Sequence, residues 1–158
     1  MNLFFQIHRL CLEKKISLST AESCTGGLFA SKISSIPGSS SFFKGGVVAY
    51  QNSIKTDVLG VKASLINEKT EVSSEVVKQM AILSRLKFNS SFSVSFSGYA
   101  GPDGGTKLKP VGTVFIGISS AENTISKRFF FNGNRKTIVD QSINSAASFL
   151  LLELKKYK

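Results

Sequence analysis

The stretch I-S-L-S-T-A-E-S-C-T-G-G, residues 16–27, decides how the rest of the sequence is interpreted. In its first half, Ile16, Leu18 and Thr20 alternate with smaller polar residues, which is typical of a short strand. Its second half places hydroxyls, a thiol and two glycines in five consecutive positions. We therefore expect a strand that runs into a tight turn.

The residues that follow this turn predict a helix. Phe29 and Ile33 lie four positions apart, a spacing that favours a helix beginning between Ser23 and Gly26. Amides at a helix N-terminus bind anions and oxyanions, so Ser23 or Cys24 is a candidate nucleophile there. The same residues also fit a simpler structure, in which the glycine pair only opens the helix and Ser23 only caps it. Spacing alone leaves both interpretations open.

Length and composition predict one domain over residues 1–158, large enough to bury its own core. No apolar run approaches the roughly 20 residues of a membrane span, and residues 1–12 do not resemble a secretion signal. We therefore expect a soluble, cytoplasmic protein with no membrane partner. Two cysteines and one histidine predict neither a disulfide framework nor a structural zinc site.

The formal net charge of +10 would favour an anionic partner, such as a nucleic acid or a phosphorylated metabolite. The lysines are spread along the whole chain, however, which favours a solvated basic surface. The sequence contains no helix-turn-helix, basic stripe or aromatic RNA-binding signature. We therefore expect no nucleic-acid partner.

Hydrophobic periodicity assigns the remaining elements. Helices are predicted over 2–15, from a cap at Asn52 or Ser53 through Leu59, over 62–69, from 72–75 onward, and after the turn at 132–135. Strands are predicted over 42–50, 92–97, 111–119 and 125–131, the first largely buried, with Gly45 and Gly46 marking a bulge or a close backbone approach, and the last two as an antiparallel pair. Strands and helices interleave, which predicts an α/β fold with a mixed sheet covered by helices.

Lys55 and His8 are the two titratable residues to consider as a catalytic base. Lys55 falls in the first turn of a predicted helix, where the helix dipole disfavours a positive charge, so it is a candidate for a lowered pKa. A solvated surface lysine is the alternative. His8, the only histidine, lies on the first predicted helix without a positioned partner, so we expect a partly exposed helix residue. Without it the chain cannot assemble a Ser-His-Asp triad.

The segment 98–106 is too rich in glycine for regular structure and too long for a plain hairpin turn. Loops of this kind commonly carry ligands, although a mobile connector has the same composition.

Three stretches together resemble one family. They are T-A-E-S-C-T-G-G at 20–27, F-F-K-G-G-V-V-A-Y-Q-N-S-I-K at 42–55, and S-G-Y-A-G-P-D-G-G-T followed by K-P-V-G-T-V within 97–114. In this order they are similar to the CinA C-terminal domain family, also called competence-damage-inducible protein. Its stand-alone members include nicotinamide mononucleotide amidohydrolases, and the similarity extends through nearly the whole chain.

The resemblance implies a three-layer α/β/α domain that hydrolyses the carboxamide of nicotinamide mononucleotide to nicotinic acid mononucleotide and ammonia, without a metal or other cofactor. It assigns the nucleophile to Ser23 and places Tyr50 and Lys55 in a Y-x-N-x-x-K motif. Since no usable histidine is present, a neutral lysine is the base that we expect for a serine. Lys55 would take the proton of Ser23, while Tyr50 would orient Lys55 or relay the proton to ammonia.

Further residues are assigned to substrate binding. The amides of Cys24, Thr25, Gly26 and Gly27 would stabilise the oxyanion. The loop would hold the nucleotide through Gly101, Asp103, Gly104, Gly105 and Thr106, and Arg135 would bind the phosphate. The partners expected are therefore a pyridine nucleotide and, for so small a domain, further copies of the same chain.

Three positions depart from the family pattern. The second arginine that usually follows four residues after the first is replaced by Val139, the H-G-A-V-S segment reads K-T-E-V-S with Glu71 in its centre, and Tyr99 stands where a smaller aliphatic residue is usual. Val139 supports an alternative function, a nucleotide-binding module with impaired catalysis. Within the enzyme hypothesis, Cys24 remains an alternative nucleophile.

Overall fold

The computed structural model describes residues 1–158 and contains one five-stranded sheet. The strands are β1 (Leu18–Glu22), β2 (Phe43–Val48), β3 (Phe92–Gly98), β4 (Thr113–Ser120) and β5 (Thr124–Phe130). The helices are α1 (Leu3–Glu13), α2 (Leu28–Ser34), α3 (Asn52–Ile54), α4 (Ala63–Lys69), α5 (Ser74–Phe88) and α6 (Arg135–Lys156), with a 3₁₀ turn η1 (Ser39–Ser41) and a π-helical turn η2 (Lys55–Leu59).

The strands lie in the order β2-β1-β3-β4-β5. β1 pairs in parallel with β2 and with β3, whereas β3 pairs with β4 and β4 with β5 in antiparallel fashion. The sheet is therefore mixed, as predicted. Because of these directions, β1, β2, β3 and β5 all end at the same edge of the sheet. Ligands of open α/β sheets bind outside the carboxyl ends of the strands, so this edge is where a site is expected.

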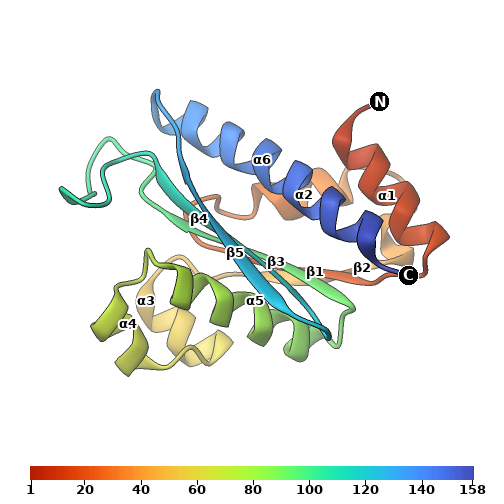
Figure 1. The fold of residues 1–158 in the computed structure, drawn as a ribbon, viewed down its shortest axis with the longest axis horizontal. Helices are drawn as coiled ribbons and strands as arrows, with labels where there is room; N and C mark the ends of the chain where they lie inside the picture. Colours follow the sequence, from red (N-terminus) through yellow and green to blue (C-terminus); the bar gives the residue numbers. More distant parts are fainter.

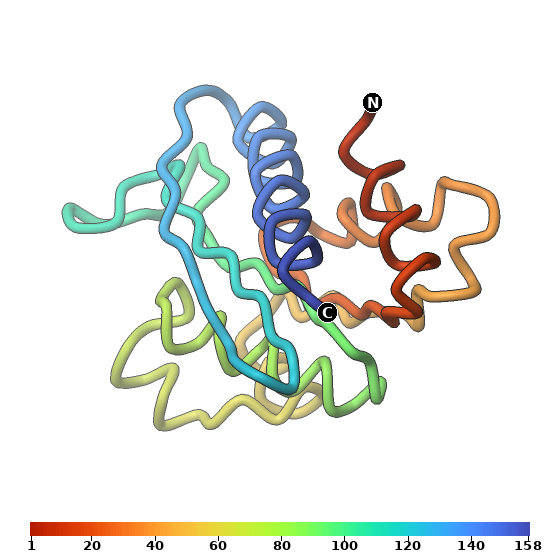
Figure 2. Tube along the Cα trace, turned by 45° about the vertical axis from the view of Figure 1, so that its right-hand side comes forward, coloured from red at the N-terminus to blue at the C-terminus, as the bar shows by residue number.

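Helices cover both faces of the sheet, which makes three layers (Figure 1). α1, α2 and α6 lie on one face, and α3, α4 and α5 lie on the other. The larger apolar core is on the first face, where residues of α1, α2 and α6 meet the sheet around Phe29 and Phe96, whose ring centroids are 5.3 Å apart. Figures 1 and 2 show α1 and α6 side by side, and Lys14 at the end of α1 bonds to the carbonyl of Leu154 on α6 at 2.9 Å.

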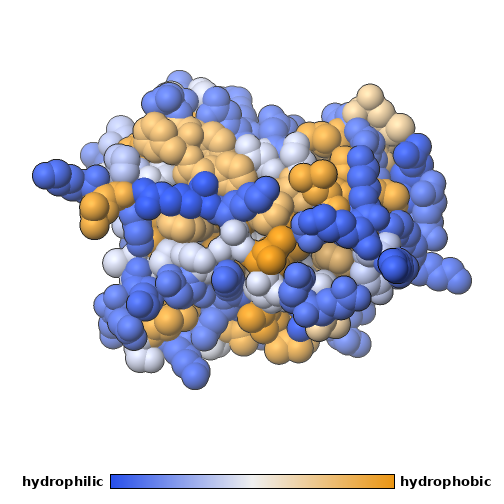
Figure 3. Space-filling model, viewed as in Figure 1, coloured by the Kyte–Doolittle hydropathy of each residue, from blue (hydrophilic) through white to orange (hydrophobic).

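The surface agrees with the spread of lysines along the chain. In Figure 3 hydrophilic residues are distributed over the whole of the face shown, with apolar residues in separate patches between them. No helix combines the length and the apolar character that crossing a lipid bilayer would require.

Most predicted elements are present with boundaries shifted by a few residues. The glycine pair in β2 marks both of the features proposed for it. The register between β1 and β2 shifts next to Leu18, where Lys44 is passed over, which is a bulge. A methyl group at Gly46 would lie 2.9 Å from the carbonyl oxygen of Thr20, which is a close approach of two backbones.

Three predictions of local structure are wrong. α2 begins at Leu28 rather than between Ser23 and Gly26, because Gly26 and Gly27 adopt φ of +60° and +95° and continue the turn. β2 is not largely buried: it is an edge strand whose residues alternate between half-buried and exposed. Neither Asn52 nor Ser53 caps the next helix, since Asn52 is its first residue and Gln51 precedes it without a side-chain cap.

Candidate active site

The turn after β1 holds Ser23 at the carboxyl edge of the sheet. The amide of Ser23 still donates to the carbonyl of Phe96 on β3 at 3.2 Å, so the backbone of this residue is fixed to the central strands. Within the turn, the amide of Gly26 donates to the carbonyl of Ser23 at 3.0 Å. The amides of Cys24, Thr25 and Gly27 form no backbone hydrogen bond within the protein. The turn therefore fixes Ser23 and leaves amide donors beside it.

Glu22 is the buried support of this turn, with only 1% of its surface exposed. Its Oε1 accepts hydrogen bonds from the hydroxyl of Thr25 at 2.6 Å and from the amide of Phe29 at 3.0 Å. Its Oε2 accepts from the amide of Ala30 at 2.9 Å. The carboxylate thus satisfies the first free amides of α2 and ties the helix to the residue before Ser23. Sequence reasoning did not assign this role to Glu22, although an acidic residue at a helix start is a recognisable signal.

Lys55 approaches Ser23 from the other side. It is the first residue of η2, in the segment that follows β2. Its Nζ lies 3.1 Å from Ser23 Oγ, at hydrogen-bond distance, and also bonds to the carbonyl of Tyr50 at 3.4 Å and to Oδ1 of Asn52 at 3.5 Å. Lys55 is 1% exposed and has no carboxylate partner within ion-pair distance.

Burial lowers the pKa of Lys55 from its ordinary value of 10.5, because the charged ammonium loses its hydration. The negative charge of Glu71 opposes this shift. The prediction of a lowered pKa is confirmed, and its main cause is desolvation rather than the helix dipole. A lowered pKa increases the share of neutral amine, which is the form that a general base needs.

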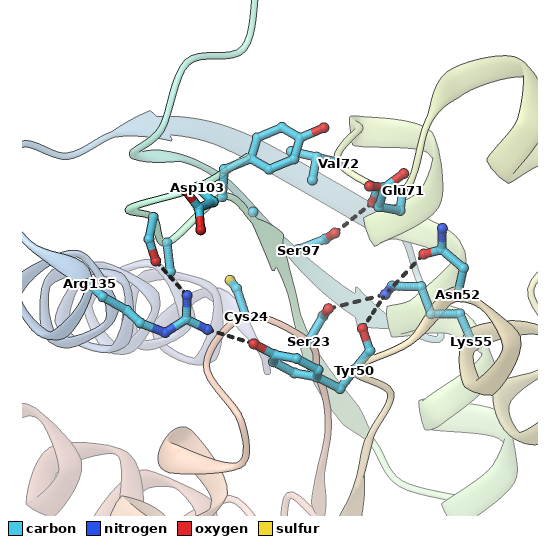
Figure 4. A pocket seen from close by; sticks show the side chains of 14 residues that line it. Ser23, Cys24, Tyr50, Asn52, Lys55, Glu71, Val72, Ser97, Asp103 and Arg135 are labelled. Atoms are coloured by element: carbon cyan, nitrogen blue, oxygen red, sulfur yellow. Dashed lines mark hydrogen bonds between the residues drawn. The ribbon is translucent and has the colours of Figure 1, made fainter. Parts of the chain in front are cut away.

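Tyr50 and Arg135 close one side of the site. The hydroxyl of Tyr50 accepts a hydrogen bond from Arg135 at 2.6 Å, while a second guanidinium nitrogen of Arg135 donates to the carbonyl of Gly101 at 2.6 Å. Tyr50 therefore contacts Lys55 through its backbone and Arg135 through its ring hydroxyl (Figure 4). Arg135 is the first residue of α6, held in place by the Asn134 cap, and retains free N–H donors toward solvent.

A cavity of about 200 Å³ lies between these residues. Seven of the predicted site residues line it: Ser23, Cys24, Tyr50, Lys55, Gly101, Asp103 and Arg135. Six others do not line it: Thr25, Gly26, Gly27, Gly104, Gly105 and Thr106. Thr25 is buried against Glu22, and Thr106 accepts a bond from the amide of Lys109 within its own loop.

The remaining lining residues were not assigned to the site from sequence: Asn52, Glu71, Val72, Ser97, Gly98, Tyr99 and Ala100. Ser97 and its neighbours could have been found, because the carboxyl end of β3 lies next to that of β1 once the two strands pair in parallel. Glu71 and Tyr99, noted as departures from the family pattern, both face this cavity. Val139 does not line it and packs against the larger core.

Cys24 and His8 are poorly placed for catalysis. Burial raises the pKa of the Cys24 thiol to about 12, so the thiol is protonated at neutral pH and is a weak nucleophile. His8 is half-buried on α1, with Nε2 3.2 Å from the carbonyl of Pro37 and its ring against Phe42. The expectation of a partly exposed, non-catalytic histidine agrees with this position. No group of three or more His, Cys, Asp or Glu side chains is arranged to hold a metal ion.

Comparison with known proteins gives the same family by sequence and by structure. The sequence model of the CinA C-terminal domain family matches residues 2–154. A CinA-like protein of Flavobacterium psychrophilum is 40% identical over 148 residues, which are 94% of this chain and 35% of the relative. A CinA-like protein of Endomicrobium trichonymphae is 46% identical over 146 residues, which are 92% of this chain and 34% of the relative. The chain thus spans about a third of these curated relatives.

Solved structures cover the chain from end to end. The competence damage-inducible protein A of Klebsiella pneumoniae superposes with a TM-score of 0.95 at 30% identity, covering 99% of this chain and 97% of that one. The competence/damage inducible protein CihA of Agrobacterium tumefaciens gives a TM-score of 0.89 at 31% identity, over 97% and 95% of the two chains. The resemblance found in the three motifs is confirmed: this chain belongs to the CinA C-terminal domain family.

Proposed function

We propose that this protein is a serine amidohydrolase that converts nicotinamide mononucleotide to nicotinic acid mononucleotide and ammonia, with Ser23 as nucleophile and Lys55 as base. The observation that carries the proposal is the 3.1 Å approach of a buried lysine to a serine at the carboxyl edge of the sheet. A serine hydroxyl is a weak nucleophile unless a base takes its proton, and a lysine is a base only when it is neutral. The contact between the two side chains and the lowered pKa of Lys55 both support this pair.

The reaction follows from the positions of these two atoms. Neutral Lys55 takes the proton of Ser23 as its oxygen attacks the carboxamide carbon, forming a tetrahedral oxyanion. The amide of Cys24, which lines the cavity and makes no backbone hydrogen bond, would donate to that oxyanion. The Lys55 ammonium returns the proton to the nitrogen, the C–N bond breaks, and ammonia leaves an ester on Ser23. Water, deprotonated by Lys55, then hydrolyses the ester and restores the serine hydroxyl.

Tyr50 and Arg135 have supporting roles in this proposal. The carbonyl of Tyr50 and the side chain of Asn52 hold the Lys55 amine toward Ser23. Arg135, with its remaining donors, is positioned to bind the phosphate of the nucleotide, and the Tyr50 hydroxyl fixes the guanidinium plane. The hydroxyl of Tyr50 is thus assigned to positioning Arg135 instead of relaying a proton. We also propose that the protein is cytoplasmic and assembles with copies of itself.

The test is product analysis with chelator-treated protein. Purified protein is incubated with nicotinamide mononucleotide or with free nicotinamide, and the acids formed are separated and quantified. We expect the mononucleotide to be converted in the presence of chelator, and free nicotinamide to react far more slowly because it lacks the phosphate. Binding of the mononucleotide without any product would instead indicate a nucleotide-binding module.

A further inference from the structure

Glu71 places an unpaired carboxylate in the cavity. Its backbone carbonyl accepts a hydrogen bond from Ser97 Oγ at 2.6 Å, which fixes the residue against β3 just before the N-terminal cap of α5. Its side chain takes part in none of the ion pairs or side-chain hydrogen bonds of the structure. Figure 4 shows Glu71 and Arg135 on opposite sides of the cavity, with Ser23 between them. Arg135 and Asp103 thus lie toward one side of the cavity, and Glu71 and Lys55 toward the other.

None of the groups that face Glu71 forms an ion pair with it. Those in the cavity are Lys55, Tyr99, Asp103 and Arg135. Lys109 follows the 98–106 segment in the sequence. Its ammonium donates to the carbonyl of Val72 and to the hydroxyl of Thr70 rather than to a carboxylate. The cavity thus holds the carboxylates of Glu71 and Asp103, in a chain whose net charge is +10.

The field of Glu71 reaches the reacting groups. It raises the pKa of Lys55, against the effect of burial, and it adds to the effect of burial in raising the pKa of Tyr99. The charge of Glu71 acts on Lys55, the base beside Ser23. It would also act on the ring of a substrate, because that ring is joined directly to the carboxamide carbon that Ser23 attacks. In the proposed function the phosphate binds Arg135 and the carboxamide binds Ser23, and Glu71 lies across the cavity from Arg135.

We propose that Glu71 makes this site selective for carboxamides carried on a cationic aromatic ring and disfavours the carboxylate product, an inference that rests on the proposed function. A pyridinium ring is attracted by the carboxylate of Glu71 and by the face of an aromatic ring such as Tyr99. The product carries a carboxylate where the amide was, and Glu71 repels it.

The test compares two ligands that differ in ring charge. Nicotinamide mononucleotide has a pyridinium ring, whereas its reduced dihydro form carries the same carboxamide and phosphate on a neutral ring. Their dissociation constants are measured by calorimetry in a Ser23→Ala background, which prevents turnover. The second change is Glu71→Gln, with Glu75→Gln as a matched control because Glu75 is exposed at the start of α5 and does not line the cavity.

We expect the cationic ligand to bind about tenfold more tightly than the neutral one, which corresponds to 1.4 kcal/mol. Glu71→Gln should bring this ratio close to one and tighten binding of nicotinic acid mononucleotide, while Glu75→Gln should leave both unchanged. An unchanged ratio in Glu71→Gln, with nicotinamide mononucleotide still hydrolysed by the wild-type chain, would overturn the selectivity and leave the proposed function standing. If neither nucleotide binds the Ser23→Ala variant and the wild-type chain does not hydrolyse nicotinamide mononucleotide, both proposals fail.

Discussion

Replacing Glu22 by glutamine should destabilise the protein strongly, although the two side chains have nearly the same shape. The buried carboxylate accepts three hydrogen bonds, at 2.6, 3.0 and 2.9 Å. Hydrogen bonds to a charged group contribute about 1.5–3 kcal/mol each. An amide nitrogen cannot accept, so Glu22→Gln leaves the Ala30 amide without a partner and weakens the other two bonds. We expect the free energy of unfolding to fall by about 2–4 kcal/mol.

Urea unfolding followed by circular dichroism measures this loss, with an unchanged slope as evidence that the folded state is intact. For a chain of 158 residues the same loss lowers the melting temperature by roughly 5–15 °C. Glu13→Gln is the matched control, because Glu13 forms only an exposed ion pair with Arg9 at 3.6 Å and should change stability by less than about 0.5 kcal/mol. A loss below 1 kcal/mol for Glu22→Gln would refute the role of Glu22 as the support of the Ser23 turn.

Three further perturbations test other parts of the structure. At pH values between the lowered pKa of Lys55 in the folded chain and its ordinary value of 10.5, the unfolded chain binds one more proton than the folded chain, so the free energy of unfolding should rise with pH. Lys55→Met should remove this rise in urea titrations at several pH values. The same pH dependence in Lys55→Met as in the wild type would contradict the burial of Lys55 as its cause. Gly46→Ala should cost about 1–3 kcal/mol in the same assay, because its methyl group would collide with Thr20. Cys24→Ala should keep the rate within about threefold of wild type, because a thiol with a pKa of about 12 is protonated at neutral pH; loss of activity would return Cys24 to consideration as nucleophile.

Much of the fold could be predicted because its determinants are local. The alternation in residues 92–97 gives β3, the apolar face of residues 76–86 gives α5, and the short turn at 121–123 joins the antiparallel pair β4 and β5. The errors occurred where tertiary context decides. An edge strand and a central strand can have the same composition, so the exposure of β2 depends on the strand order and not on its own residues. The start of α2 depends on two glycines that remain in the turn.

The candidate site shows the same division. Ser23 and Lys55 are 32 positions apart, and their approach could be expected only from the family motifs. Sequence reasoning assigned the glycines after Ser23 to substrate binding, whereas the structure uses them to shape the turn. Glu22 and Glu71 have opposite environments that spacing cannot distinguish. The first is buried among amides, and the second is unpaired in a cavity formed by five separate segments of the chain.

The most direct test of the central claim is ammonia release from saturating nicotinamide mononucleotide by the wild-type chain, Ser23→Ala and Lys55→Ala. Each variant should lose at least about a thousandfold in kcat, because the two side chains act as one unit. Calorimetry should show that Ser23→Ala still binds the nucleotide, which separates lost chemistry from lost binding. Ammonia release by either variant at a rate near that of the wild type would contradict the Ser23–Lys55 mechanism.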